Sequence, residues 1–217
     1  MPTEIFGENS RLYGRIITMR VYISADYAEY SGDRQVVDIL NAWGKDALHK
    51  VEFVDTAKVN SGSVSKKSDC RICDLKAEFN RQINVSSHVI IVIGDRTAQR
   101  MAGSKCERNK KCQRDCFCTP YKQNINGPCQ CKVYDTCPAV DDVGCINDYS
   151  YLRHEFEQAK KKKKKIIVVY NSLYKKTCWL PDYMSEYAPL AGPFWIKNEA
   201  GRKIGNYGFI KRELDYE

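Results

Sequence analysis

The chain has 217 residues and a formal net charge of +8. Six of its positive charges come from the lysine run 160–165, so the remainder carries little net charge and no broad nucleic-acid-binding face is expected. No hydrophobic run approaches the roughly 18 to 20 residues that span a bilayer, and the N-terminus lacks the continuous apolar core of a secretory signal. We therefore expect a soluble cytoplasmic protein with no membrane partner.

Apolar segments typical of buried strands alternate along the chain with segments of helical periodicity. The segments 89–93 (VIIVI) and 166–170 (IIVVY) are apolar on both parities, as expected for strands covered by helices on both faces. This alternation predicts an α/β fold with a parallel sheet of about five strands in a flavodoxin-like order. The predicted strands lie at 19–24, 51–55, 89–93 and 166–170, with an edge strand at 193–196. The predicted helices lie at 33–45, around Leu75, Phe79 and Ile83, and from Ser150 onward.

A long segment without this alternation, 97–148, separates the third and fourth predicted strands. It is too long for an ordinary connection, so we expect a cysteine-rich inserted subdomain within a main domain of residues 18–217. Residues 1–17 lie outside the repeating pattern and form a predicted N-terminal extension.

The chain contains eleven cysteines, far above ordinary usage, and ten of them fall between positions 70 and 145. In a cytosolic chain such clustering favours metal thiolates, here structural zinc, over disulfides. Disulfides and free thiols stay open, and the spacings do not assign the pairing. The candidate ligands are Cys70, Cys73, Cys106, Cys112, Cys116, Cys118, Cys129, Cys131, Cys137 and Cys145. Cys178 lies outside the cluster and is expected to be a buried core residue.

The helix that is predicted to begin at Ser150 carries the most informative carboxylate. Apolar side chains at i, i+4 and i+7 from Leu152 define its inward face, and Tyr151 and Glu155 lie together on the flank. Glu155 is therefore expected at the edge of the core or in a cleft; the alternative is a rim charge paired with an arginine. The lysine run after it is expected to be a solvated helix end that complements the helix dipole.

Ligands of such sheets bind beyond the carboxyl ends of the strands, where the strand order reverses. Here this position follows the first and third strands, which places residues 25–34 and 94–100 beside the cleft. Neither GxGxxG nor GxxxxGK[ST] occurs in the sequence. The sequence therefore supports neither a Rossmann dinucleotide fingerprint nor a P-loop.

Four segments together resemble TIR domains, and more narrowly the TIR-like subunit of the Thoeris anti-phage systems. They are MRVYISADYAEYSGDR, CDLKAEFNRQINVSSHVIIVIGDRT, YLRHEFEQA with KKIIVVYNS, and GPFWIKNEAGRKIGNYGFIKREL. The resemblance covers roughly residues 19–100 and 148–214. It implies a TIR-like sheet, an enzyme that cleaves NAD between nicotinamide and ribose, and a cyclic or conjugated ADP-ribose product. The product would activate an effector protein in antiviral defence, with a phage component as trigger and with self-association.

The resemblance also implies the catalytic residue, because bacterial TIR enzymes carry their catalytic glutamate in a WxxxE pattern. Here that pattern matches Tyr151 and Glu155, with tyrosine in place of tryptophan. A carboxylate beside the ribose stabilises the oxocarbenium-like cation that forms when the glycosidic bond breaks. Two alternatives stay open: a non-catalytic TIR-like or zinc-binding scaffold, and a nucleoside deoxyribosyltransferase-like enzyme.

Four residues near the predicted cleft are candidate contacts to NAD, and each has a structural alternative. Ser24 binds the ligand or caps a loop, and Asp26 binds ribose or caps a turn. Tyr27 stacks on nicotinamide or adenine, or packs under its own loop. Arg34 contacts a phosphate, or faces solvent and pairs with an acid. His154 is expected on another side of its helix from the carboxylate, either structural or exposed.

Overall fold

The computed structural model describes residues 19–26, 32–45, 51–55, 71–100 and 150–215, without the side chains of residues 71–74 and 77. The predicted N-terminal extension, Tyr27 and residues 101–148 of the predicted insertion lie outside the described residues. Within the described ranges, no helix combines the length and the apolar character needed to cross a membrane.

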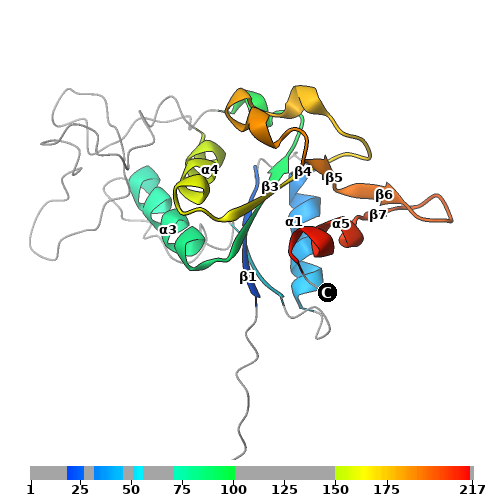
Figure 1. Ribbon diagram of the computed structural model, residues 1–217, viewed down its shortest axis with the longest axis horizontal. Coiled ribbons are helices and arrows are strands. Elements are labelled where there is room, and N and C mark those ends of the chain that lie inside the picture. The colour runs from blue at the N-terminus through cyan, green and yellow to red at the C-terminus, as the bar shows by residue number, and fades with distance from the viewer. Residues whose placement is uncertain (1–18, 27–31, 46–50, 56–70, 101–149, 216–217) are drawn as a thin grey trace, which may run out of the picture.

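A five-stranded sheet lies at the centre of the fold, and all of its strand pairs are parallel. Its strands are β1 (Met19–Ser24), β2 (Val51–Asp55), β3 (His88–Ile93), β4 (Lys165–Tyr170) and β5 (Gly192–Pro193). The strand order is β2-β1-β3-β4-β5, so the predicted flavodoxin-like α/β fold is confirmed (Figure 1). The order reverses at β1, where the sequence places the cleft.

Helices cover both faces of this sheet. They are α1 (Asp33–Gly44), α3 (Arg71–Val85), α4 (Tyr151–Lys161) and α5 (Tyr207–Glu213). Helices α1 and α5 pack on one face, and α3 and α4 lie on the other (Figure 1). We call these two sides of the sheet the α1 face and the α4 face.

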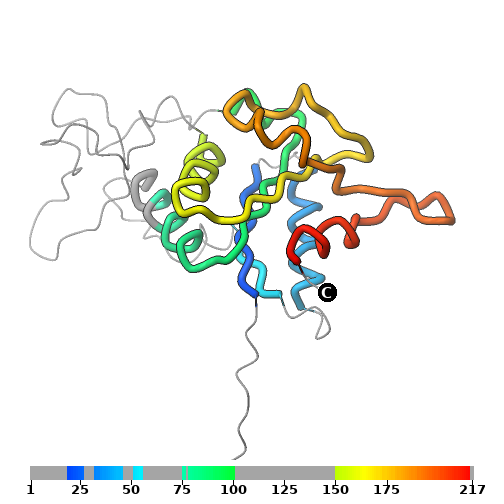
Figure 2. The backbone as a smooth tube through the Cα atoms, in the orientation of Figure 1, coloured from blue at the N-terminus to red at the C-terminus, as the bar shows by residue number. Residues whose placement is uncertain are grey.

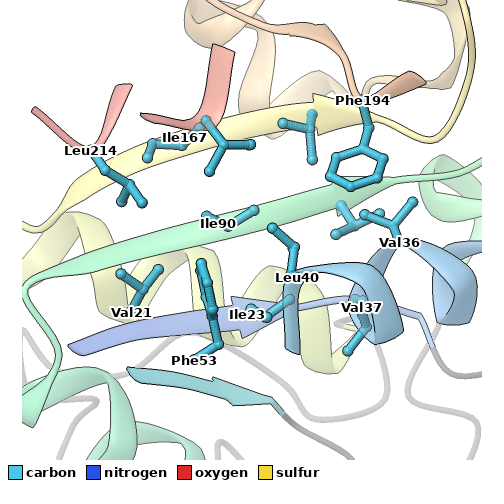
Figure 3. Close-up of a cluster of buried hydrophobic side chains, with 14 of the residues drawn as sticks. Val21, Ile23, Val36, Val37, Leu40, Phe53, Ile90, Ile167, Phe194 and Leu214 are labelled. Carbon is cyan, nitrogen blue, oxygen red and sulfur yellow. The ribbon is translucent and has the colours of Figure 1, made fainter. Parts of the chain in front are cut away.

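The alternation of side chains along β1 explains why both faces are buried. Val21 and Ile23 point into the core of the α1 face, where they meet Leu40 and Phe53 (Figure 3). Tyr22, between them, belongs to the core of the α4 face together with Phe156. Each fully buried side chain of this size stabilises the fold by about 1.5–3 kcal/mol relative to an exposed position. A strand that contributes to two cores has to be apolar on both parities, as the sequence of β3 and β4 is.

The edge of the sheet beyond β4 differs from the prediction. We expected one edge strand over residues 193–196, but only Gly192 and Pro193 pair with β4. The chain then leaves the sheet and forms an antiparallel hairpin of β6 (Trp195–Lys197) and β7 (Lys203–Gly205), which projects from the body of the molecule (Figure 2). The reason is local, since the hairpin strands pair with each other and Phe194 accepts a hydrogen bond from the backbone N–H of Asn206 at 2.6 Å.

The lysine run forms the end of α4, as predicted, but it is not merely solvated. Helix α4 ends at Lys161. The ammonium of Lys164 donates to the backbone carbonyls of Asn84 and Ser86, at 2.8 and 2.6 Å, and so joins the end of α4 to the end of α3. Lys165 forms an ion pair of 2.7 Å with Asp215. The run therefore fixes the turn between α4 and β4.

Candidate functional site

The first turn of α4 lies at the carboxyl edge of the sheet. Because α4 connects β3 to the parallel strand β4, it runs opposite to the strands and begins where β3 ends. Ser150 caps this beginning, since its Oγ accepts a hydrogen bond of 3.1 Å from the backbone N–H of Arg153. The cap fixes the position from which the side chains of the first two turns project.

Glu155 is buried on this part of α4, with 1% of its surface exposed. Tyr151, one turn earlier on the same flank, packs edge-on against Phe79 of α3 with ring centroids 5.6 Å apart. Leu152 and Phe156, on the neighbouring stripe, belong to the core under α4. Glu155 therefore lies between the sheet-facing stripe and α3. Its burial shows that it is not a solvent-exposed charge, and pairing with an arginine stays an alternative.

Two further ionisable side chains are buried where α3 and α4 meet. His154 is 1% exposed and Lys76 is fully buried. Burial, reinforced by the charge of Lys76, holds the pKa of His154 well below its usual value, so the imidazole is neutral. The expectation that His154 is exposed is wrong, and its structural alternative agrees with this position. The sequence did not point to Lys76, since nothing in its local pattern separates it from a solvent-facing lysine.

Ser24 ends β1 on the same face as Glu155. It has the parity of Tyr22, whose ring lies in the core of the α4 face. The residue is fully buried, and its Oγ has no hydrogen-bond partner among the described residues. The described residues therefore contain no loop that Ser24 caps. A buried hydroxyl without a partner costs about 1–3 kcal/mol, which makes it a candidate contact for a bound molecule.

The other predicted cleft residues have protein partners. Asp26 forms an ion pair with Arg100, which follows the short helix η1 (Thr97–Gln99). This pair joins the two segments that the sequence places beside the cleft. Arg34 is exposed and pairs with Asp38 at 3.3 Å, one turn along α1. This position agrees with the solvent-facing interpretation of Arg34, and its contact to a phosphate stays a prediction.

A second buried carboxyl, Asp33, lies at the same edge but on the α1 face. It is 1% exposed, and its Oδ1 accepts a hydrogen bond of 3.1 Å from the amide of Asn171, after β4. The Oδ1 of Asn171 in turn accepts a hydrogen bond of 2.7 Å from the indole N–H of Trp195. Gly94 packs against the carboxyl so closely that a Cβ there would lie 2.6 Å from Oδ1.

Burial raises the pKa of Asp33 to about 7, although the hydrogen bond from Asn171 lowers it. Neighbouring charges modulate this value: Asp26 and Asp95 raise the pKa, and Arg100 lowers it. The sequence pattern does not single out Asp33. An acid in the first turn of a helix is common on dipole grounds alone, so its position carried no signal of burial.

The predicted zinc ligands cannot be assembled from the described residues. Among those residues, no group of three or more His, Cys, Asp or Glu side chains is arranged to hold a metal ion. Cys73 lies in α3, but its side chain and the remaining nine candidate cysteines are outside the described residues. Cys178 is exposed in the short helix η4 (Thr177–Trp179), so its predicted burial is wrong. Its bulky neighbour Trp179 packs against the core.

Comparison with known proteins adds no identification. No family model matches the chain, and a search of curated proteins also finds no match.

Proposed function

We propose that this protein is a TIR-like enzyme that cleaves NAD at the bond between nicotinamide and ribose. One observation carries the proposal: Glu155 is a buried carboxylate beside the carboxyl edge of a flavodoxin-like sheet. The unpartnered hydroxyl of Ser24 lies on the same face of that edge. Ligands of such sheets bind at this edge, next to the strand where the order reverses.

The chemistry requires a negative charge next to the ribose. As the glycosidic bond breaks, positive charge develops on the ribose carbon and its ring oxygen, and nicotinamide leaves as a neutral molecule with the bonding electron pair. A carboxylate in a site shielded from water stabilises that cation far better than one at the surface. Glu155 is the residue that we assign to this role. Ser24 is assigned to hydrogen-bond the substrate, and Tyr151 to form an aromatic wall.

A nucleophile, either the adenine of the same molecule for a cyclic product or a separate acceptor for a conjugate, then bonds to the ribose carbon and gives the product. We propose a cyclic or conjugated ADP-ribose messenger that is made in the cytoplasm and activates a separate effector in anti-phage defence. Self-association and a phage component as trigger belong to the same proposal. Zinc in the cysteine-rich segment is proposed from the clustering of the cysteines alone. We expect it to be structural, because four thiolates would close its coordination.

The test is nicotinamide release from NAD, followed by chromatography and mass spectrometry of the nucleotide products. We expect Glu155→Gln to reduce the rate by about 100-fold or more, since it removes the stabilising charge while keeping the shape of the side chain. Glu157→Gln is the matched control, because Glu157 lies on the same helix and is only half-buried. We expect that variant to keep the wild-type rate.

A parallel incubation with a deoxynucleoside and a free base separates the rival enzyme class, since exchange of the base would indicate a deoxyribosyltransferase. Extracts of phage-infected cells that express the chain supply a trigger that a purified sample lacks. Wild-type extracts that consume no NAD would contradict the proposed function. An unchanged defence phenotype in Glu155→Gln cells would instead favour the scaffold.

A further inference from the structure

Tyr170, the last residue of β4, has a buried polar atom that the proposed mechanism does not use. The residue is fully buried, and its phenol oxygen has no hydrogen-bond partner among the described residues. A buried tyrosine hydroxyl normally finds a partner. Leaving it without one costs about 1–3 kcal/mol, which a phenylalanine at this position would avoid.

The backbone holds Tyr170 in a fixed place. The residue pairs with Ile93 of β3 on one side and with Pro193 of β5 on the other. Its carbonyl accepts a hydrogen bond of 2.8 Å from the backbone N–H of Phe194, and the next residue, Asn171, donates one of 2.8 Å to Ile93. The hydroxyl therefore cannot reach a partner through a shift of the strand.

The ring lies on the α4 face at the carboxyl edge, which is the face and the edge of Glu155 and Ser24. Tyr170 belongs to the same core cluster as Leu152 and Phe156 of α4. Ser24 and Tyr170 thus flank β3 from its two neighbouring strands, β1 and β4, with both side chains on one face. Ser24 lies level with Val168, two residues before Tyr170, and one bound molecule that spans this distance would supply the partner that each hydroxyl lacks.

Chemistry restricts the contact that Tyr170 can make. Burial is the main cause that raises the pKa of Tyr170, and the nearby thiol of Cys178 adds to it. The phenol therefore stays protonated at neutral pH and acts as a neutral hydrogen-bond donor. The exposed position of Cys178 indicates that this end of the cluster lies close to the surface of the molecule.

We propose that Tyr170 is a further ligand-binding residue of this site, whose hydroxyl donates a hydrogen bond to an oxygen of the bound dinucleotide. The inference rests on the proposed function for the identity of the ligand. A binding role predicts an unusual pair of effects. Removing the hydroxyl should weaken ligand binding and should leave stability unchanged or higher, because no protein partner is lost.

The experiment compares Tyr170→Phe with wild type by thermal unfolding and by calorimetric titration with ADP-ribose. Tyr187→Phe is the matched control, since the Tyr187 ring packs in the same cluster, 5.5 Å from the Phe156 ring. We expect Tyr170→Phe to keep or raise the melting temperature and to weaken ADP-ribose binding about 5- to 10-fold, as for one lost hydrogen bond. The control should bind ADP-ribose as wild type does.

Unchanged ADP-ribose affinity in Tyr170→Phe would overturn the inference and would indicate a buried water as the missing partner. A clear loss of melting temperature would also overturn it, since the hydroxyl would then have a partner within the protein. If wild type binds ADP-ribose without consuming NAD, the proposed function fails. The titration then still decides whether the Tyr170 hydroxyl contacts the ligand. If wild type neither binds ADP-ribose nor consumes NAD, both proposals fail.

Discussion

The two faces of the sheet differ in whether the buried polar side chains at the carboxyl edge have hydrogen-bond partners. On the α1 face, Asp33, Asn171 and Trp195 form a hydrogen-bonded chain that joins the start of α1 to the segments after β4. On the α4 face, the hydroxyls of Ser24 and Tyr170 are buried without a partner among the described residues. A fully bonded network rigidifies a fold, whereas unpartnered groups cost stability and are retained where a ligand completes them. We therefore propose a structural role for the α1 face and a binding role for the α4 face.

Among the substitutions on the α1 face, Asn171→Ala should lower the free energy of unfolding most. The substitution leaves the Asp33 carboxyl without its amide donor and the Trp195 indole N–H without its acceptor. Two buried polar groups that lose their partners should cost about 3 kcal/mol in the free energy of unfolding, measured by urea titration. Asn198→Ala is the control, since its side chain accepts only an exposed turn hydrogen bond of 2.9 Å from Arg202, and it should cost less than about 1 kcal/mol.

Asp33→Asn should change the pH dependence of stability. The carboxyl titrates near 3.8 when unfolded and at about 7 when folded, so the folded state binds the proton more tightly between these values. Stability should therefore fall as pH rises from about 4 to 7 and stay lower above it. Asparagine keeps the acceptor oxygen without the charge, so the variant should be about 2 kcal/mol more stable than wild type at pH 8. The positive end of α1 offsets part of the larger cost that burial alone would give.

At pH 3.5, below the pKa of the unfolded carboxyl, the two proteins should unfold at nearly the same urea concentration. An Asp33→Asn variant that is less stable than wild type at pH 8 would show that the charged form of Asp33 stabilises the fold.

Gly94→Ala tests how tightly the α1 face is packed. The added Cβ would lie 2.6 and 2.7 Å from the two carboxyl oxygens of Asp33, which the hydrogen bond from Asn171 holds in place. We expect a loss of about 1.5 kcal/mol, as is typical of overpacking. Gly208→Ala in α5 is the control, because nothing lies within 4 Å of its Cβ position, and it should be neutral or slightly stabilising.

Ser24→Ala tests the α4 face and should have the smallest effect on stability. Its Oγ has no partner to lose, so the free energy of unfolding should stay within about 0.5 kcal/mol of wild type or rise. Ser86→Ala is the matched control, since that serine is also buried and its Oγ donates to the carbonyl of Gln82 at 2.9 Å. The control should lose about 1 kcal/mol, and an equal loss in Ser24→Ala would indicate a protein partner for Ser24.

The sequence predicted what depends on local pattern. Strands such as β3 are apolar on both parities, and the stripe of Leu152 places Glu155 on the flank of α4, so the sheet and the candidate carboxylate could both be derived. The hydrogen-bonded network on the α1 face could not be derived from the sequence, because Asp33 and Asn171 are separated by 138 positions. The sequence also could not show that the Tyr170 hydroxyl lacks a hydrogen-bond partner. A period-two pattern gives the face of a residue but not what its terminal atom contacts.

Glu155 and Asp33 are two equally buried carboxyls at one edge of the sheet, on opposite faces. The most direct test of the central claim is therefore the rate of nicotinamide release from NAD at pH 6 for Glu155→Gln and Asp33→Asn in the same extracts. At that pH Asp33, with its pKa of about 7, is mainly protonated, and asparagine imitates it. The α4-face assignment predicts a loss of about 100-fold or more for Glu155→Gln and a rate within about twofold of wild type for Asp33→Asn. Loss of activity in Asp33→Asn with retention in Glu155→Gln would contradict it and would move the chemistry to the α1 face.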